Sequence, residues 1–130
     1  MRELKFRAWD KKDKFFIDNG ALQFGADGKI YYINAGLEYG EPVLEREDIT
    51  DEVIVEQYTG LKDKNGKEIY EGDIINCWGK FVSCVTFDDF LTAFVWLSDD
   101  GDGYHILSKQ EDAWEVIGNI HENLELLEGK

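Results

Sequence analysis

QYTGLKDKNGKEIYEGD, the stretch from Gln57 to Asp73, decides the fold. Its centre, DKNG at residues 63–66, predicts a tight turn: the aspartate can accept hydrogen bonds from the backbone two residues on, and the Asn-Gly pair tolerates a left-handed backbone. Leu61 and Ile69 flank the turn as apolar anchors. We interpret the stretch as an architectural turn that joins two parts of the chain. The alternative is that a rigid, exposed loop forms a contact surface here.

Toward the N-terminus, short apolar runs alternate with turn signals, which is typical of a β-rich domain. Leu4–Trp9 and Phe15–Asp18 are predicted as two strands. Ala21–Phe24 and Lys29–Ile33 are predicted as a hairpin, because the Asp-Gly pair at 27–28 tolerates the positive φ of a tight reversal.

The middle of the chain is less regular. Tyr39–Val43 holds the single proline, Pro42, and is predicted as a loop. An acidic stretch, Glu45–Glu52, follows and leaves open a short helical turn at Arg46–Thr50. Val53–Tyr58 is β-branched and aromatic, so a strand is predicted there.

The C-terminal part predicts a small barrel. Short connections separate five predicted strands, and closure would remove their exposed edges. These strands are Ile74–Trp78, Phe81–Phe87, Thr92–Leu97, Tyr104–Leu107 and Trp114–Ile120, followed by a helical or extended tail at Glu122–Glu128. The predicted fold is mainly β: an N-terminal antiparallel β layer (residues 1–56) packed against a five-stranded SH3-like barrel (residues 57–130), or one integrated domain.

Composition excludes disorder and argues against nucleic-acid binding. Of the 130 residues, 43% are hydrophobic and 14% aromatic, which supports a packed core. The net charge of −14 repels phosphates, whose binding needs clustered Lys and Arg. Residues 1–30 alone carry a positive balance, seven basic against five acidic side chains, so only this segment could approach a polyanion.

Cys77 and Cys84 have a spacing that fits neither a CxxC redox pair nor a zinc pattern. We expect a buried, reduced pair, with pairing across a hairpin as the alternative. The chain has no apolar segment long enough for a signal peptide or a membrane span, which predicts a cytoplasmic protein without membrane contact.

Three segments bracket nearly the whole chain: KFRAWD at residues 5–10, the stretch that opens at Gln57, and VIGNIHEN at residues 116–123. Together they resemble the YopX family of uncharacterised phage and prophage proteins. Leu124 departs from the pattern, since family members often have proline after the asparagine. The resemblance implies a β-rich fold with an SH3-type barrel and a bacterial host cell, and it transfers no catalytic residue.

The acidic clusters are interpreted as turns. An EF-hand alignment of the cluster near residue 100 puts His105 where the loop needs glycine, so a solvated turn is favoured over a calcium site. Asp88 and Asp89 are adjacent and would point to opposite faces of a strand, which does not suit paired acid–base chemistry. The calcium-loop candidates are Asp99, Asp100, Asp102 and Glu111.

The sequence predicts no enzyme. His105 and His121 are too few for a typical zinc site, and no nucleotide-binding or hydrolase motif is present. Ser83, Ser98 and Ser108 have no visible activating partner. We therefore assign no catalytic, cofactor-binding or metal-binding residue and expect no cofactor.

Aromatic residues are numerous enough either to build the core or to line a binding groove. The core interpretation is favoured for the tryptophans, and the tyrosines are divided between the two. The residues concerned are Trp9, Trp78, Trp96, Trp114, Tyr31, Tyr32, Tyr58 and Tyr70.

The predicted function is a small, non-enzymatic protein that binds another protein or itself, as a homo-oligomer. Its acidic surface and surplus of aromatic residues motivate this hypothesis. One rival is a DNA mimic that blocks a host nucleic-acid enzyme, which requires carboxylates aligned on one face. The other is nucleic-acid binding through the basic N-terminus, with Arg2, Lys5, Arg7, Lys11, Lys12 and Lys14.

Overall fold

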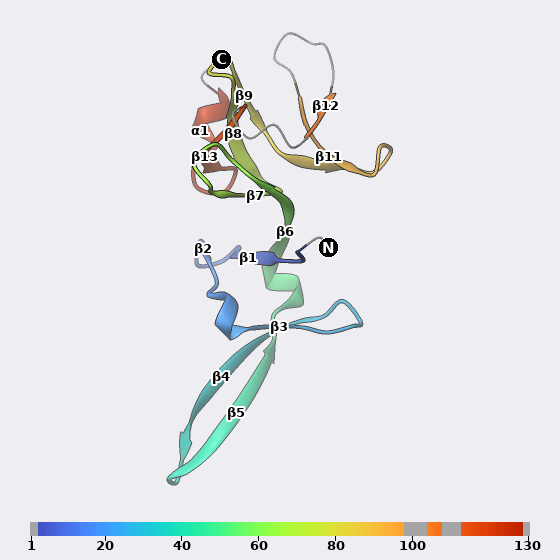
Figure 1. The fold of residues 1–130 in the computed structure, drawn as a ribbon. Coiled ribbons are helices and arrows are strands. Elements are labelled where there is room, and N and C mark those ends of the chain that lie inside the picture. Colours follow the sequence, from blue (N-terminus) through green and yellow to red (C-terminus); the bar gives the residue numbers. More distant parts are fainter. Residues whose placement is uncertain (1–2, 98–103, 108–112, 129–130) are drawn as a thin grey trace. The chain divides into compact units, whose positions relative to one another are not determined.

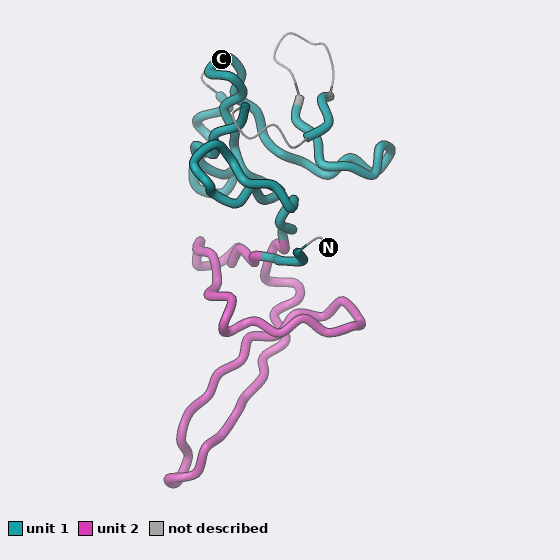
Figure 2. The backbone as a smooth tube through the Cα atoms, viewed as in Figure 1, with its two compact units in different colours: residues 1–6, 56–130 teal, residues 7–55 magenta. Residues whose placement is uncertain are grey.

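The computed structural model describes residues 3–97, 104–107 and 113–128, and it confirms a mainly β protein (Figure 1). The chain forms two compact units, coloured separately in Figure 2. Unit 2 contains residues 7–55, and unit 1 contains residues 1–6 and 56–130. No helix in the described part of the chain is long and apolar enough to cross a membrane.

Unit 2 contains two antiparallel groups of strands. The strand β1 pairs with β2, and β3, β4 and β5 form a three-stranded sheet in that order. The elements are β1 (Phe6–Asp10), β2 (Phe15–Phe16), the 3₁₀ turn η1 (Asn19–Ala21), β3 (Leu22–Phe24), β4 (Ile30–Glu38), β5 (Glu41–Asp48) and the 3₁₀ turn η2 (Thr50–Glu52). A small core of five buried residues lies beneath them: Ala8, Ile17, Ile30, Ile49 and Val53.

The β3–β4 hairpin is confirmed, with Gly28 at φ 86° in its turn. The predicted loop at Tyr39–Val43 is wrong, because Tyr39 and Gly40 form the turn of the β4–β5 hairpin and β5 begins at Glu41. Tyr39 and Gly40 both take positive φ, 51° and 79°, which matches the twist of a tight two-residue turn. Pro42 then lies in β5, an edge strand, where its missing N–H is tolerated.

The acidic stretch continues this strand. Pairing of β5 with β4 extends from Glu41 to Asp48, so the helical turn left open at Arg46–Thr50 is displaced to η2 at Thr50–Glu52. The Asp48 carboxylate accepts hydrogen bonds from the Thr50 backbone N–H and hydroxyl, which fixes the change from strand to turn.

Unit 1 contains the remaining strands, in three-stranded sheets of order β13-β8-β9 and β10-β11-β12 and in the β6–β7 hairpin. The elements are β6 (Val53–Lys62, which starts in unit 2), β7 (Glu68–Tyr70), β8 (Asp73–Cys77), β9 (Phe81–Cys84), β10 (Thr86–Asp88), β11 (Ala93–Leu97), β12 (Tyr104–Ile106), β13 (Trp114–Asn119) and the helix α1 (Glu125–Glu128). The SH3-like closure of these strands stays a prediction.

One predicted strand is split. Phe81–Phe87 divides into β9 and β10 at Val85, which is fully buried. The Val85 N–H donates to the Asp73 carbonyl and its carbonyl accepts from the Gly72 N–H. The buried Val85 therefore separates β9, in the β13-β8-β9 sheet, from β10, in the β10-β11-β12 sheet.

The core of unit 1 is aromatic and aliphatic. Its buried members are Ile69, Ile75, Cys77, Val85, Trp96, Leu107, Ala113 and Trp114. Cys77 is buried and Cys84 is half-buried, and neither forms a disulfide. In the β8–β9 hairpin Cys77 lies opposite Phe81 and Cys84 opposite Ile74, so the register does not place the two thiols across from each other.

Gly72 offers a test of this packing. Its φ is +88°, and an added Cβ would collide with the Glu56 carboxylate. Gly66 has φ +82° but open space around it. We expect Gly66→Ala to cost about 1 kcal/mol of unfolding free energy through backbone strain alone. Gly72→Ala should cost about 3 kcal/mol, because the collision adds to the strain. Urea denaturation of the two variants measures the difference, and equal losses would contradict the packing described.

Candidate binding site

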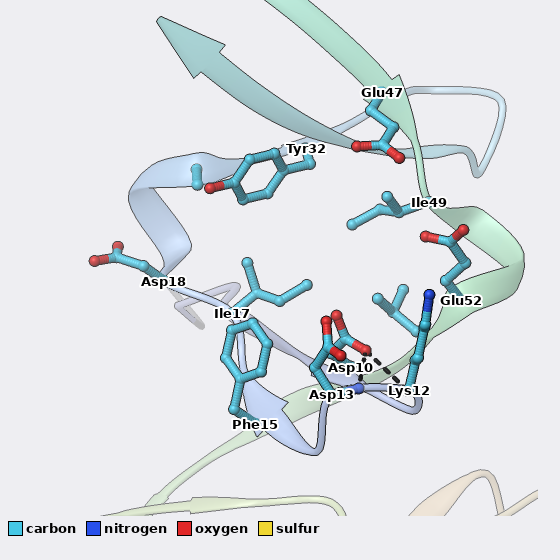
Figure 3. Close-up of a pocket in the computed structure, with 12 residues that line it drawn as sticks. Asp10, Lys12, Asp13, Phe15, Ile17, Asp18, Tyr32, Glu47, Ile49 and Glu52 are labelled. Carbon is cyan, nitrogen blue, oxygen red and sulfur yellow. Dashed lines mark hydrogen bonds between the residues drawn. The ribbon is translucent and has the colours of Figure 1, made fainter.

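Unit 2 contains an open cavity of about 410 Å³ (Figure 3). Its charged lining residues are Asp10, Lys12, Asp13, Asp18, Glu47 and Glu52. Its apolar and aromatic lining residues are Phe15, Ile17, Ala21, Tyr32, Ile49 and Val53. The cavity thus combines one ammonium group and five carboxylates with an apolar wall.

The turn between β1 and β2 positions one acidic side of the cavity. One carboxylate oxygen of Asp10 accepts the backbone N–H groups of Lys12 and Asp13, at 2.9 Å each. The Lys11 N–H donates to the Glu52 carbonyl at 3.1 Å, which ties this turn to η2. In Figure 3 the Asp10 and Asp13 carboxylates lie beside each other and Lys12 extends toward Glu52.

The floor of the cavity is an extension of the core of unit 2. Ile17, Ile49 and Val53 are buried there and hold their positions through core packing. Phe15 and Tyr32 form a more exposed rim, with 48% and 38% of their surface accessible. A ligand in the cavity would therefore meet aliphatic groups below and aromatic rings at the side.

The electrostatics of the cavity favour a cation. The lining carries a formal charge of −4 at neutral pH, from five carboxylates and one lysine. The Asp18 carboxylate points away from the opening in Figure 3 and accepts the Gly20 N–H, whereas the other four carboxylates lie around the open space. A lysine or arginine side chain fits this chemistry, because its aliphatic stem packs on apolar surface while its charge meets carboxylates.

Sequence reasoning did not find this site. Its carboxylates come from the β1–β2 turn, the end of β5 and η2, which are far apart in the sequence. The only available signal was the recurrence of aspartate and glutamate in turns, and that pattern is typical of any soluble turn.

The residues considered as metal ligands or catalysts lie elsewhere. His105 stacks on Trp96, with ring centroids 4.4 Å apart, and His121 pairs with Glu56. Asp88 ends β10 by accepting the Phe90 and Leu91 N–H groups, as expected of a turn. Within the ranges described, no group of three or more His, Cys, Asp or Glu could hold a metal ion. Asp99, Asp100, Asp102 and Glu111, with Ser98 and Ser108, lie outside the described residues, and Ser83 is buried.

The aromatic residues divide between core and surface. Trp9, Trp96, Trp114 and Tyr58 are buried, whereas Trp78 is 57% exposed, with its ring 5.6 Å from that of Trp114. Tyr31 and Tyr70 are half-buried, and Tyr32 lines the cavity. The tryptophans therefore serve mainly as core, and one tyrosine contributes to the candidate site.

The stretch from Gln57 to Asp73, which we call the signature stretch, is anchored by a buried carboxylate. Asp63, only 4% exposed, accepts the N–H groups of Asn65 and Lys67 on one oxygen and that of Val116 on the other, each at 2.9 Å. Burial raises the pKa of Asp63, but the backbone donors outweigh burial, and the pKa lies below its usual value. The turn is thus fixed to β13, while its tip at residues 64–66 is exposed.

The C-terminal VIGNIHEN segment, residues 116–123, also lies in unit 1. His121 Nε2 lies 3.0 Å from Glu56 Oε2, with both side chains almost fully buried. The Asn119 side chain accepts the His121 N–H, and Asn123 accepts the Asn119 N–H. Gly118 leaves no room for a Cβ beside Asn123. These residues build a turn and offer no open reactive group.

The chain is therefore a mainly β protein of two compact units, whose turns are held by buried polar residues. The chain belongs to the YopX protein family, whose model matches residues 5–128. It is similar to protein EF1440 from Enterococcus faecalis, with 28% identity, coverage of 98% of this chain and 99% of that one, and a TM-score of 0.67. It has the fold of protein yopX from Bacillus subtilis, with 23% identity, coverage of 97% and 98%, and a TM-score of 0.61. No curated protein matches the chain.

Asp63→Asn tests the buried carboxylate. The amide can supply only one accepting oxygen, so its NH₂ would face either the Val116 N–H or the N–H groups of Asn65 and Lys67. We expect a loss of about 2 kcal/mol of unfolding free energy at pH 7. Because the folded pKa is lowered, this contribution is present above the unfolded pKa and is lost as the pH falls below about 4.

Urea denaturation at pH 7, 5 and 3 provides the measurement. The gap between wild type and Asp63→Asn should narrow from pH 5 to pH 3. Asp89→Asn, which removes an exposed carboxylate from a turn, serves as the matched control and should follow the wild type at every pH. A gap that stays constant down to pH 3 would contradict the role given to Asp63.

Proposed function

We propose that this protein is a non-enzymatic binding module that holds a partner protein at the cavity of unit 2. The observation that supports the proposal is the combination of an apolar floor with four carboxylates facing one open space. The partner chemistry that fits is a basic side chain, lysine or arginine, flanked by apolar residues. A phage or prophage origin and residence in the bacterial cytoplasm are part of the same proposal and rest on the family.

Charge and burial would act at different stages of binding. The net charge of −14 attracts a basic partner over distance and raises the association rate. Affinity then depends on the desolvated contacts, here Ile17, Ile49 and Val53 below the ligand and Tyr32 beside it. A partner without apolar groups would bind weakly and lose its affinity in salt.

The lining favours binding over catalysis. It contains no serine, cysteine or histidine, so it lacks the nucleophile–base pairs typical of covalent catalysis. The lining carboxylates suit recognition of a cation. We therefore propose recognition without turnover.

A DNA mimic is the second candidate, and one observation favours it. Glu38, Glu41, Glu45 and Glu47 lie on the same face of the β4–β5 hairpin. Glu38 lies opposite Glu41, and Glu45 and Glu47 follow Glu41 at even spacings along β5, where every second side chain points to the same face. A nucleic-acid binder through the N-terminus has less support. Lys5 pairs with Glu68, and Lys12 lies in the acidic cavity.

A peptide titration tests the cavity. The probe is a fluorescent octapeptide of alternating arginine and leucine, followed by anisotropy at 50 mM salt. We expect the double variant Glu47→Gln/Glu52→Gln to bind about fivefold more weakly, because it removes two facing carboxylates. Glu38→Gln/Glu41→Gln removes the same charge outside the cavity and should bind like the wild type. Equal weakening by both would reduce the effect to net charge and contradict the site.

A pull-down from host lysate tests the wider proposal. Wild-type protein should retain a specific partner that the Glu47→Gln/Glu52→Gln bait loses. If no specific partner is retained and light scattering gives a monomer, the binding-module proposal fails. Retention of a nucleic-acid enzyme that Glu38→Gln/Glu41→Gln loses would support the DNA mimic instead.

A further inference from the structure

The β4–β5 hairpin extends well past the strand that supports it. β3 pairs with β4 only as far as Tyr32, so from Ile33 onward β4 has β5 as its one paired neighbour among the described strands. We call residues 33–46 the arm. Its tip at Tyr39 is 98% exposed, and none of its residues belongs to the buried core of either unit. An isolated two-stranded ribbon of this kind is at best marginally stable in water.

The register divides the arm into two chemically different faces. Directly opposed residues in an antiparallel pair share a face, and faces alternate along each strand. One face, which we call the apolar face, carries Ile33, Ala35, Leu37, Pro42, Leu44 and Arg46. The other, the acidic face, carries Asn34, Gly36, Glu38, Glu41, Val43 and Glu45.

The apolar face is uncovered. Leu37 is 76% exposed and Leu44 is 67% exposed, although they lie on the same side of the ribbon. A contiguous apolar surface with a polar reverse side marks an interaction surface. Strand addition at an edge of the ribbon would leave this face in water, so a partner must pack over the face itself. Pro42 and the charged residues of β5 also oppose addition at the outer edge.

Charge decides which partner fits. Two copies of a protein with a net charge of −14 repel each other, so a contact between them is favoured only at a surface that brings no further carboxylates together. The apolar face meets that condition from Ile33 to Leu44. Its one charged residue, Arg46, lies at the base of the arm, over the Tyr31 ring at 4.5 Å and bonded to Gln23. The glutamates occupy the reverse side, so the apolar face itself offers no carboxylate to a basic partner.

We propose that two copies of this chain associate by packing the apolar faces of their arms against each other. The contact is isologous, with Leu37 and Leu44 of each copy at its centre and both acidic faces in solvent. It covers the exposed leucines of both ribbons, which stabilises a hairpin that is marginal alone. The cavity of unit 2 is a different surface, so the two proposals stand or fall separately.

The test is the oligomeric state of the full chain by sedimentation equilibrium. We expect a dimer whose Kd rises at least 100-fold in Leu37→Ser/Leu44→Ser, because the change removes from each copy two exposed leucines that the proposed contact would bury. Asn34→Ser/Glu45→Ser makes two changes on the acidic face and should leave the dimer intact. Because both leucines are exposed within one copy, circular dichroism should give the same fold for all three proteins.

Salt separates this contact from an ionic one. Raising salt from 50 to 500 mM should tighten the dimer, because screening reduces repulsion between acidic copies and leaves apolar contact intact. A wild-type monomer at 100 μM, or a dimer that Leu37→Ser/Leu44→Ser does not weaken, would overturn the proposal. Binding of the arginine-leucine peptide by Leu37→Ser/Leu44→Ser should equal that of wild type, which keeps failure here distinct from failure of the cavity.

Discussion

The carboxylate of Asp63 is the constraint on which the C-terminal half of the structure depends. It is buried, yet the backbone donors of two segments more than 40 residues apart satisfy it: Asn65 and Lys67 on its own turn, and Val116 on β13. A buried anion without those donors would be costly, so the turn and the strand must form together. This coupling joins the signature stretch to the VIGNIHEN segment, which begins at Val116.

The buried polar residues of unit 1 hold its turns and strands together, and we propose that recognition takes place on unit 2. Asp63, Glu56, Asn119 and His121 all accept or share hydrogen bonds inside unit 1. The cavity and the arm instead present exposed groups that a partner could contact. The cavity has carboxylates above an apolar floor, and the arm has exposed leucines. Loops and projecting hairpins on a rigid scaffold commonly carry function for this reason.

The turns could be predicted from neighbouring residues, whereas contacts between residues far apart in the sequence could not. The Asp-Gly pair before Lys29 and the DKNG turn each specify a reversal within four residues, and both turns are confirmed. The loop prediction at Tyr39–Val43 failed because it rested on Pro42, and an edge strand such as β5 tolerates proline. The positive φ of Tyr39 forms part of the turn that precedes this strand. The Glu56–His121 pair spans 65 residues, and the cavity draws on three separate segments. No local pattern encodes either.

The signature stretch is held by its own hydrogen bonds, and we propose that binding occurs on unit 2. Amide chemical-shift mapping of the ¹⁵N-labelled full chain, titrated with the arginine-leucine octapeptide, tests it most directly. We expect shifts at Asp13, Phe15 and Glu52, with Asn65 and Val116 unchanged. Shifts confined to Asn65 and its neighbours in the turn would contradict it.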